Sequence, residues 1–202
     1  MKSISLILFL LFGFGVFAQD FNSDLKAFRE SIELEIDGEY SKAADRLKQN
    51  YSPNSYEYNL RLGWLDYLAG QYIESTTYYQ KALALKPMSI EARNGIAHPM
   101  LALGKTDMVI KVYKEILQIS PNETSVNYRL ALIYYQKGQY KEAEKHLSLV
   151  INLFPFDYDT VVLLAWNYYQ MGKFNDAKIL FQKALLFKPN DESASEGLKL
   201  IN

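Results

Sequence analysis

Apolar positions recur with helical spacing along most of the chain, and the pattern itself repeats. Small side chains occupy one position of each repeat and large apolar side chains follow four residues later, which places both on one helical face. The small positions are Ala43, Ser75, Val109, Ala143 and Ala177, and the large positions are Leu47, Tyr79, Tyr113, Leu147 and Phe181. A large residue followed by a small one marks the preceding segment, at Leu62-Gly63, Ile96-Ala97, Leu130-Ala131 and Leu164-Ala165. We therefore expect pairs of helices whose cores form columns that run from repeat to repeat.

Proline, glycine and capping residues set the ends of these helices. A proline closes each second helix because it lacks the backbone N–H, and its spacing is 34 residues throughout, at Pro53, Pro87, Pro121, Pro155 and Pro189. Glycine accepts the left-handed conformation that ends a first helix, at Gly38, Gly70, Gly104, Gly138 and Gly172. The expected N-caps of the following helices are Ser55, Ser89, Asp157 and Asp191, whereas Glu123 is a poor cap.

Together these features resemble the tetratricopeptide repeat, a helix-turn-helix unit of 34 residues. The resemblance implies an all-α fold, a right-handed α-solenoid of five repeats with a C-terminal capping helix. The expected segments are a lead-in at 19–23, an irregular first repeat at 24–55, repeats at 56–89, 90–123, 124–157 and 158–191, and the capping helix at 192–202. The first repeat is irregular because the interval from Gly38 to Pro53 is two residues shorter than its counterparts.

The first 18 residues have the pattern of a secretory signal peptide. Lys2 precedes an apolar run from Ile4 to Phe17, and Val16 and Ala18 form a small-x-small cleavage site. We expect cleavage after Ala18 and export to the periplasm or the extracellular space. The alternative is a membrane tether through an uncleaved signal, although this run is shorter than the roughly 20 residues that span a bilayer.

Composition excludes several classes of function. The net charge is −1, which gives no positive excess for nucleic acid and opposes the alternative of a pentatricopeptide-like RNA-binding array. Cysteine is absent and only two histidines occur, so thiol chemistry and histidine-rich metal sites are not expected. No phosphate-binding loop, nucleophile elbow or zinc-binding helix is found. We expect no catalytic residue, metal, cofactor or small-molecule substrate, and a non-catalytic subunit of an envelope enzyme assembly stays an alternative.

In tetratricopeptide proteins the first helices line a concave groove that receives a peptide or helix of another protein. The resemblance therefore implies a protein or peptide partner, here from the cell envelope or the extracellular space. Trp64 and Trp166 lie 102 residues apart, which is three repeats, so they share one column. Aromatic side chains often carry binding energy, but they can equally pack between adjacent helices. The candidate groove residues are Leu60, Trp64, Tyr67, Asn94, His98, Tyr128, Tyr135, Trp166, Tyr169 and Gln170.

Three further features bear on this groove. Pro99 falls inside a first helix and predicts a kink, and His98 beside it is interpreted as structural because no second metal ligand stands at a suitable spacing. Arg29, Arg61 and Arg129 recur on first helices, but the lysine and asparagine of the family's carboxylate clamp are missing. These arginines either pair with an acidic peptide or remain solvated. Self-association through a terminal repeat is a further alternative.

Overall fold

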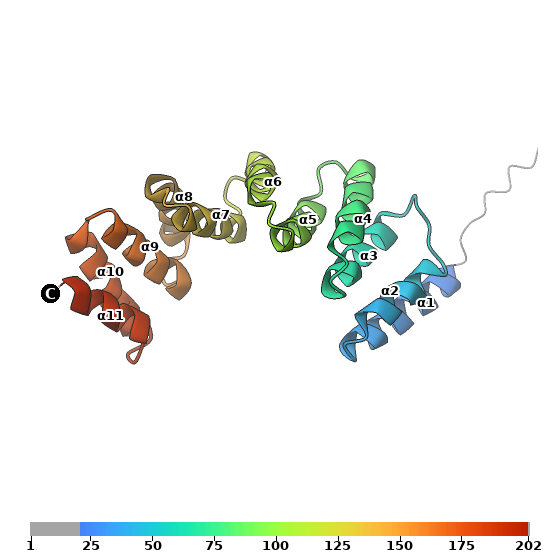
Figure 1. Cartoon of the computed structure of the whole chain (residues 1–202), viewed down its shortest axis with the longest axis horizontal. Helices are drawn as coiled ribbons and strands as arrows, with labels where there is room; N and C mark the ends of the chain where they lie inside the picture. Colours follow the sequence, from blue (N-terminus) through green and yellow to red (C-terminus); the bar gives the residue numbers. More distant parts are fainter. Residues whose placement is uncertain (1–20, 202) are drawn as a thin grey trace, which may run out of the picture. The chain divides into compact units, whose positions relative to one another are not determined.

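The computed structural model describes residues 21–201, and all regular structure in that range is helical (Figure 1). The helices are α1 (Phe21–Ile36), α2 (Tyr40–Lys48), α3 (Tyr56–Leu68), α4 (Tyr72–Leu85), α5 (Ile90–Ala102), α6 (Thr106–Ile119), α7 (Thr124–Gln136), α8 (Tyr140–Leu153), α9 (Tyr158–Gln170), α10 (Phe174–Phe187) and α11 (Glu192–Ile201). Consecutive helices pack as hairpins, beginning with α1 and α2 and ending with α9 and α10. The predicted all-α arrangement of tetratricopeptide type is confirmed.

The helices belong to two compact bodies. The N-terminal body contains α1 and α2, and the C-terminal body begins at Ser52 and contains α3 to α11. Within the C-terminal body each hairpin packs on the next, so that α4 contacts α5, α6 contacts α7 and α8 contacts α9. The sequence pattern predicted one continuous array and gave no sign of a division after Tyr51.

The turns inside the hairpins depend on glycine, as predicted. All five turn glycines have φ angles between 70° and 76°, a region that strains any residue with a Cβ atom. At Gly70 the backbone N–H donates to the Tyr67 carbonyl at 3.0 Å, and the next N–H, of Gln71, donates to the Asp66 carbonyl at 2.7 Å. These bonds satisfy carbonyls that the helix end would otherwise leave unpaired.

The predicted N-caps are also confirmed. The Ser55 and Ser89 hydroxyls accept from backbone N–H groups three residues later, and the Asp157 and Asp191 carboxylates do the same. Glu123 makes no such bond. Sequence reasoning overlooked a second device at these junctions, in which the buried Asn59 side chain donates to the carbonyls of the preceding loop, at 3.0 Å to Pro53 and 2.7 Å to Ser55.

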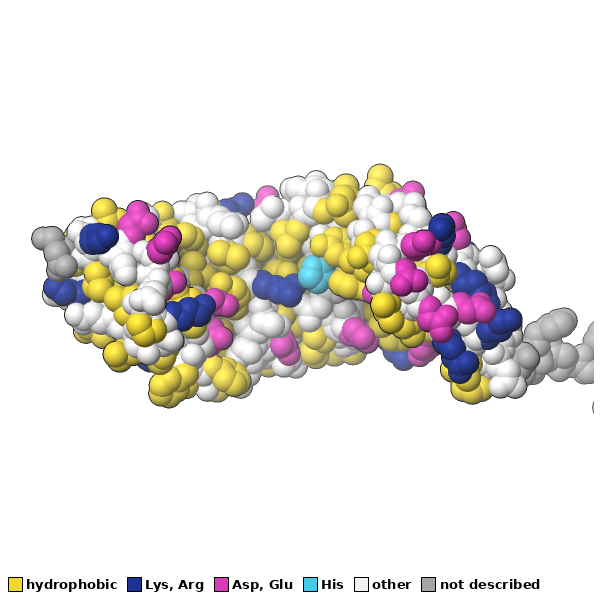
Figure 2. All heavy atoms as spheres, turned by 90° about the horizontal axis from the view of Figure 1, so that it is seen from below, with side chains coloured by type: hydrophobic (Ala, Val, Ile, Leu, Met, Phe, Trp, Pro, Cys, Tyr) yellow, Lys and Arg dark blue, Asp and Glu magenta, His cyan; other side chains and the backbone are white. Residues whose placement is uncertain are grey.

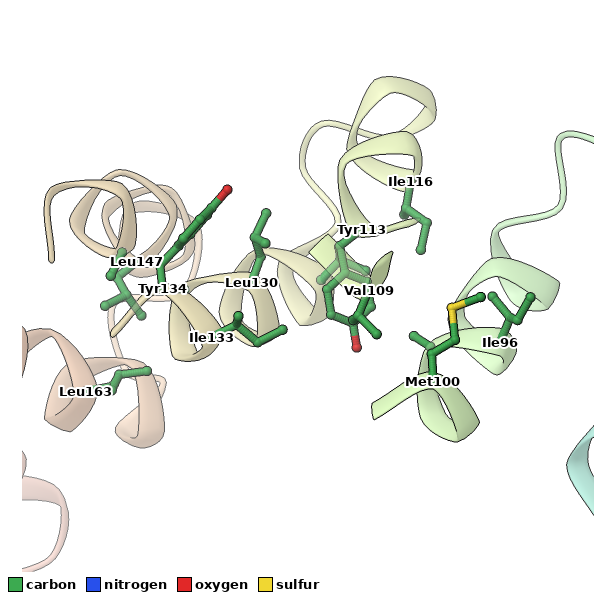
Figure 3. Close-up of a cluster of buried hydrophobic side chains, with 14 of the residues drawn as sticks. Ile96, Met100, Val109, Tyr113, Ile116, Leu130, Ile133, Tyr134, Leu147 and Leu163 are labelled. Carbon is green, nitrogen blue, oxygen red and sulfur yellow. The ribbon is translucent and has the colours of Figure 1, made fainter. Parts of the chain in front are cut away.

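The core of the C-terminal body follows the predicted columns. The small and large positions of each second helix are buried, as are the large-small pairs of the first helices. Figure 3 shows Ile96 and Met100 of α5, Val109 and Tyr113 of α6 and Leu130 of α7 within one cluster of buried side chains. Each such side chain contributes about 1.5 to 3 kcal/mol to the free energy of folding when it is fully removed from water.

Helix α11 covers the last hairpin. It packs on α10 and α9 in the way that α5 packs on α4 and α3, so it stands in the place of the first helix of a further repeat. Ala194 is fully buried there, and Leu198 and Ile201 pack against the same cluster. Gly197 lies against the ring of Phe181, where an added Cβ would come within 2.3 Å of a ring carbon.

The N-terminal body differs from the other hairpins. Helix α1 begins at Phe21, three residues before the expected start of the first repeat at residue 24. Helix α2 has nine residues where its counterparts have fourteen, which agrees with the short interval before Pro53. Arg46 donates to Glu30 and to Asn50, whose amide donates to Ser23, and these bonds join the two helices. The hydrogen bond from Arg46 holds the pKa of Glu30 below its ordinary value.

The predicted signal peptide, residues 1–18, lies outside the described residues, as do residues 19, 20 and 202. Among the described helices, none is both long and apolar enough to cross a membrane.

Candidate functional site

The ten candidate groove residues all lie on α3, α5, α7 or α9, the first helices of the hairpins in the C-terminal body. Gln170 is exposed and the other nine are partly buried. We refer to these ten residues as the first-helix face. Figure 2 views one side of the molecule and shows hydrophobic side chains gathered in its middle, with a histidine and basic side chains among them.

An aromatic cluster joins α3 to α5 on this face. The Trp64 ring lies 5.7 Å from the Tyr67 ring and 6.4 Å from the His98 imidazole, and Tyr67 lies 5.3 Å from His98. All three side chains are partly buried, so each keeps surface that another molecule can contact. Partly exposed aromatic groups offer apolar area at a small cost in side-chain entropy.

A cation adjoins this cluster. Arg129 of α7 is exposed, and its Nη1 lies 3.5 Å from His98 Nε2. Burial, and then the charge of Arg129, lower the pKa of His98 below its ordinary value of 6.5. The imidazole is therefore mostly neutral at pH 7. Pro99, the next residue, is buried in α5, which continues past it to Ala102, so the proline faces the core and does not line the first-helix face.

Trp166 stands in the same column as Trp64 but has different surroundings. Its indole N–H donates to the Ser193 hydroxyl of α11 at 2.9 Å. Its ring meets the fully buried Phe181 ring edge-on at 4.9 Å, and Tyr169 at 5.6 Å. These contacts give Trp166 a packing role against the capping helix, which is one of the two alternatives that the sequence left open for it.

Three of the four tyrosines of the first-helix face also make contacts within their own hairpins. Each packs against the aromatic residue that opens the second helix, five residues later, with ring separations of 5.5 to 6.0 Å. The pairs are Tyr67 with Tyr72, Tyr135 with Tyr140, and Tyr169 with Phe174. Part of each ring therefore supports the turn, and the remainder stays accessible.

Tyr128 lines a cavity of about 360 Å³ at the N-terminal ends of α7 and α9, together with Asp157, Asp159 and Thr160. Burial raises the pKa of the Tyr128 phenol, and the charges of Asp159 and Asp157 raise it further. Sequence reasoning missed this cavity. The sequence did contain one indication of it, because Thr160 is a polar residue at a buried position that Val126 occupies one repeat earlier.

The arrangement offers few groups for catalysis or metal binding. No three histidine, cysteine, aspartate or glutamate side chains of residues 21–201 lie together as a metal site would require. His98 has an arginine beside it, and His146 of α8 stacks on Tyr134 and shares a hydrogen bond with Asn127 at 2.8 Å. The first-helix face itself offers partly exposed apolar side chains and hydrogen-bonding groups.

Comparison with protein families recognises tetratricopeptide repeats in two adjoining segments, residues 100–159 and residues 158–191. These segments cover α6 to α10 and the end of α5. Tetratricopeptide repeats are thus present in the C-terminal body by sequence as well as by structure.

Relatives in sequence carry the same repeat. The chain is 27% identical over 193 residues to the TPR repeat-containing protein MJ1428 of Methanocaldococcus jannaschii, a match that covers 90% of the chain and 34% of that protein. It is 28% identical over 89 residues to the TPR repeat-containing thioredoxin TTL4 of Arabidopsis thaliana, which covers 44% of the chain and 13% of that protein. The chain thus spans about a third or less of these relatives.

Solved structures share the fold. A tetratricopeptide repeat protein from Parabacteroides merdae ATCC 43184 matches with a TM-score of 0.78 at 20% identity, over 89% of this chain and 72% of that one. MamA from Desulfovibrio magneticus RS-1, residues 41 to the end, matches with a TM-score of 0.74 at 17% identity, over 85% and 98%. At these identities the likeness concerns the fold alone.

Proposed function

We propose that the C-terminal body holds a segment of another protein or a peptide against the first-helix face, and that Trp64, Tyr67 and His98 form its central anchor. The observation that carries this proposal is the aromatic cluster itself, which is partly exposed and bridges two successive hairpins. A partner that contacts this cluster buries aromatic surface from α3 and α5 at once.

The cation beside this cluster, Arg129, indicates which side chains a bound segment should carry. Arg129 is exposed and its nearest polar contact is a neutral imidazole, so a bound segment that carries a carboxylate next to an apolar side chain suits this part of the face. We propose a non-catalytic role, in keeping with tetratricopeptide scaffolds in general.

A further part of the proposal concerns where the partner is met. We propose that the chain is exported after cleavage at Ala18 and meets its partner in the cell envelope or the extracellular space. The support is the signal-like pattern of residues 1–18. Mass spectrometry of the mature protein tests this step, and a chain that keeps Met1 would contradict cleavage.

The binding proposal is tested by selecting peptides from a random phage library on the full-length protein. The dissociation constant of a selected peptide is then measured for wild type, Trp64→Ala and Tyr78→Ala. Tyr78 is a partly buried aromatic residue of α4, a second helix, and serves as the matched control. We expect Trp64→Ala to weaken binding at least about 30-fold, as for an interface hot spot, and Tyr78→Ala to leave it unchanged. Equal affinities for wild type and Trp64→Ala would overturn the proposal.

Self-association is a second candidate, because apolar side chains are exposed near the end of the solenoid. Phe156 is 77% exposed, Leu186 is 82% exposed and Phe154 is 56% exposed. Apolar patches of this kind often mark contact surfaces. Light scattering with Phe156→Ser as a variant tests it, and a strict monomer of wild type at high concentration would exclude it.

A further inference from the structure

The cavity between α7 and α9 has features that the binding of an apolar segment does not explain. Its wall includes Ser125 and Tyr128 of α7, Phe154 of the loop after α8, and Asp157, Asp159 and Thr160 at the start of α9. We refer to it as the acidic pocket. Tyr128 belongs to the first-helix face, so the pocket opens beside the surface proposed above to hold a partner.

The charge of the acidic pocket is negative. Asp157 and Asp159 are the only charged residues in its wall, and neither forms a salt bridge with any described residue of the chain. Asp157 accepts the Thr160 backbone N–H at 2.9 Å through one oxygen. Burial, and then the charges of Asp159 and Asp157, raise the pKa of the Tyr128 phenol. The pocket therefore combines an aromatic wall with two carboxylates that no basic side chain of residues 21–201 neutralises.

A buried hydroxyl provides an independent observation. Thr160 is fully buried and lines the pocket, yet its Oγ1 has no hydrogen-bond partner. The same column holds Val126 one repeat earlier and Ala194 in α11, both fully buried. An unpaired hydroxyl in such a place costs stability, and a valine would fit without that cost. A ligand that supplies an N–H donor would remove the penalty.

We infer that the acidic pocket receives the side chain of a lysine or arginine from the protein partner held on the first-helix face. The alkyl part of such a side chain suits the rings of Tyr128 and Phe154, and its cation suits Asp157 and Asp159. A donor on the cation would satisfy the Thr160 hydroxyl, which requires the pocket wall around this buried residue to move on binding. A divalent metal fits less well, because two carboxylates fall short of the six or more oxygen ligands that calcium takes. This inference rests on the proposed function.

The test of this inference uses a ligand small enough to bind the acidic pocket without contacting the rest of the first-helix face. The ¹⁵N-labelled full-length protein is titrated with Nα-acetyl-lysine N-methylamide, whose side-chain ammonium is free. A second titration uses the norleucine analogue, whose alkyl side chain is similar but carries no charge. We expect saturable amide shifts at Tyr128, Asp159 and Thr160 with the lysine probe alone. Added salt should weaken the binding, since it depends on charge.

Two variants and a control locate the interaction. Asp159→Asn should raise the dissociation constant of the lysine probe at least about tenfold, because a charge-assisted bond is lost. Thr160→Val should also raise the dissociation constant of the lysine probe, and the variant chain should remain folded. Asp176→Asn changes an exposed aspartate of α10 away from the pocket, and should leave the affinity unchanged.

The outcomes separate this inference from the proposal on which it rests. If the norleucine probe produces the same shifts, or if Asp159→Asn binds the lysine probe as wild type does, the pocket is not a cation site. If selected peptides bind the first-helix face but carry no basic residue that Asp159→Asn affects, the inference fails and the proposed function stands. If the lysine probe binds while no peptide contacts Trp64, the proposed function fails.

Discussion

The indole N–H of Trp166 donates to the hydroxyl of Ser193 at 2.9 Å, and this bond ties α9 to α11. Trp64 occupies the same column three repeats earlier, where the adjacent first helix offers the His98 ring at 6.4 Å. Both tryptophans of this column therefore pack against the buried core, and one of them is also bonded to the capping helix while the other belongs to a partly exposed aromatic cluster.

Trp166→Ala should lower the free energy of unfolding by about 3 to 5 kcal/mol, as truncation of a large core aromatic does. Ser193→Ala removes only the hydrogen bond and should cost about 1 kcal/mol. Urea denaturation followed by circular dichroism measures both. A loss below 1 kcal/mol for Trp166→Ala would show that the indole contributes little to packing.

Gly197→Ala should destabilise the protein by about 1 to 3 kcal/mol, because its Cβ would come within 2.3 Å of the Phe181 ring. One repeat earlier, Leu147 of α8 and Leu163 of α9 occupy the equivalent positions and are both buried, so a leucine in place of Phe181 leaves room for a side chain at position 197. The double variant Gly197→Ala with Phe181→Leu should therefore lose less than the sum of the single losses. Strict additivity in denaturant titrations would contradict the contact.

Arg129→Gln should raise the pKa of His98 towards 6.5, although burial, the larger cause of the shift, should still keep it lower. The imidazole resonances of His98 in an NMR pH titration report this value. Because the unfolded chain binds this proton more readily than the folded one, stability should fall as the pH drops below 6.5, and Arg129→Gln should reduce that fall. An unchanged pKa would place Arg129 away from His98 in solution.

Thr160→Val should raise the free energy of unfolding by about 1 kcal/mol, since it removes a buried hydroxyl that has no partner. The same change at an exposed residue, Thr77→Val on α4, is the control and should have little effect. Thermal unfolding at neutral pH measures both. A destabilised Thr160→Val would mean that the hydroxyl has a bonding role within the free protein.

Much of the fold could be predicted because its signals are local. A glycine such as Gly70 is needed for a positive φ, and a serine such as Ser55 caps the helix that follows it. Both effects act within a few residues, so spacing alone placed the turns and helix starts. The columns were equally predictable, because identical spacing gives equivalent burial when each repeat packs on its neighbour.

The candidate site was less predictable because it depends on contacts between repeats that differ. Trp64 and Trp166 are equivalent by position, yet Ser193 and Phe181 surround one of them and His98 borders the other. The 34-residue spacing likewise does not reveal the division after Tyr51.

The most direct measurement of the central claim is the fluorescence of Trp64 during binding. The chain has two tryptophans, so the variant Trp166→Phe reports Trp64 alone. Addition of a selected peptide should shift its emission to shorter wavelength and reduce its quenching by acrylamide, because the partner covers the partly exposed indole. Emission and quenching that stay the same at saturating peptide would contradict the claim that Trp64 lies in the binding site.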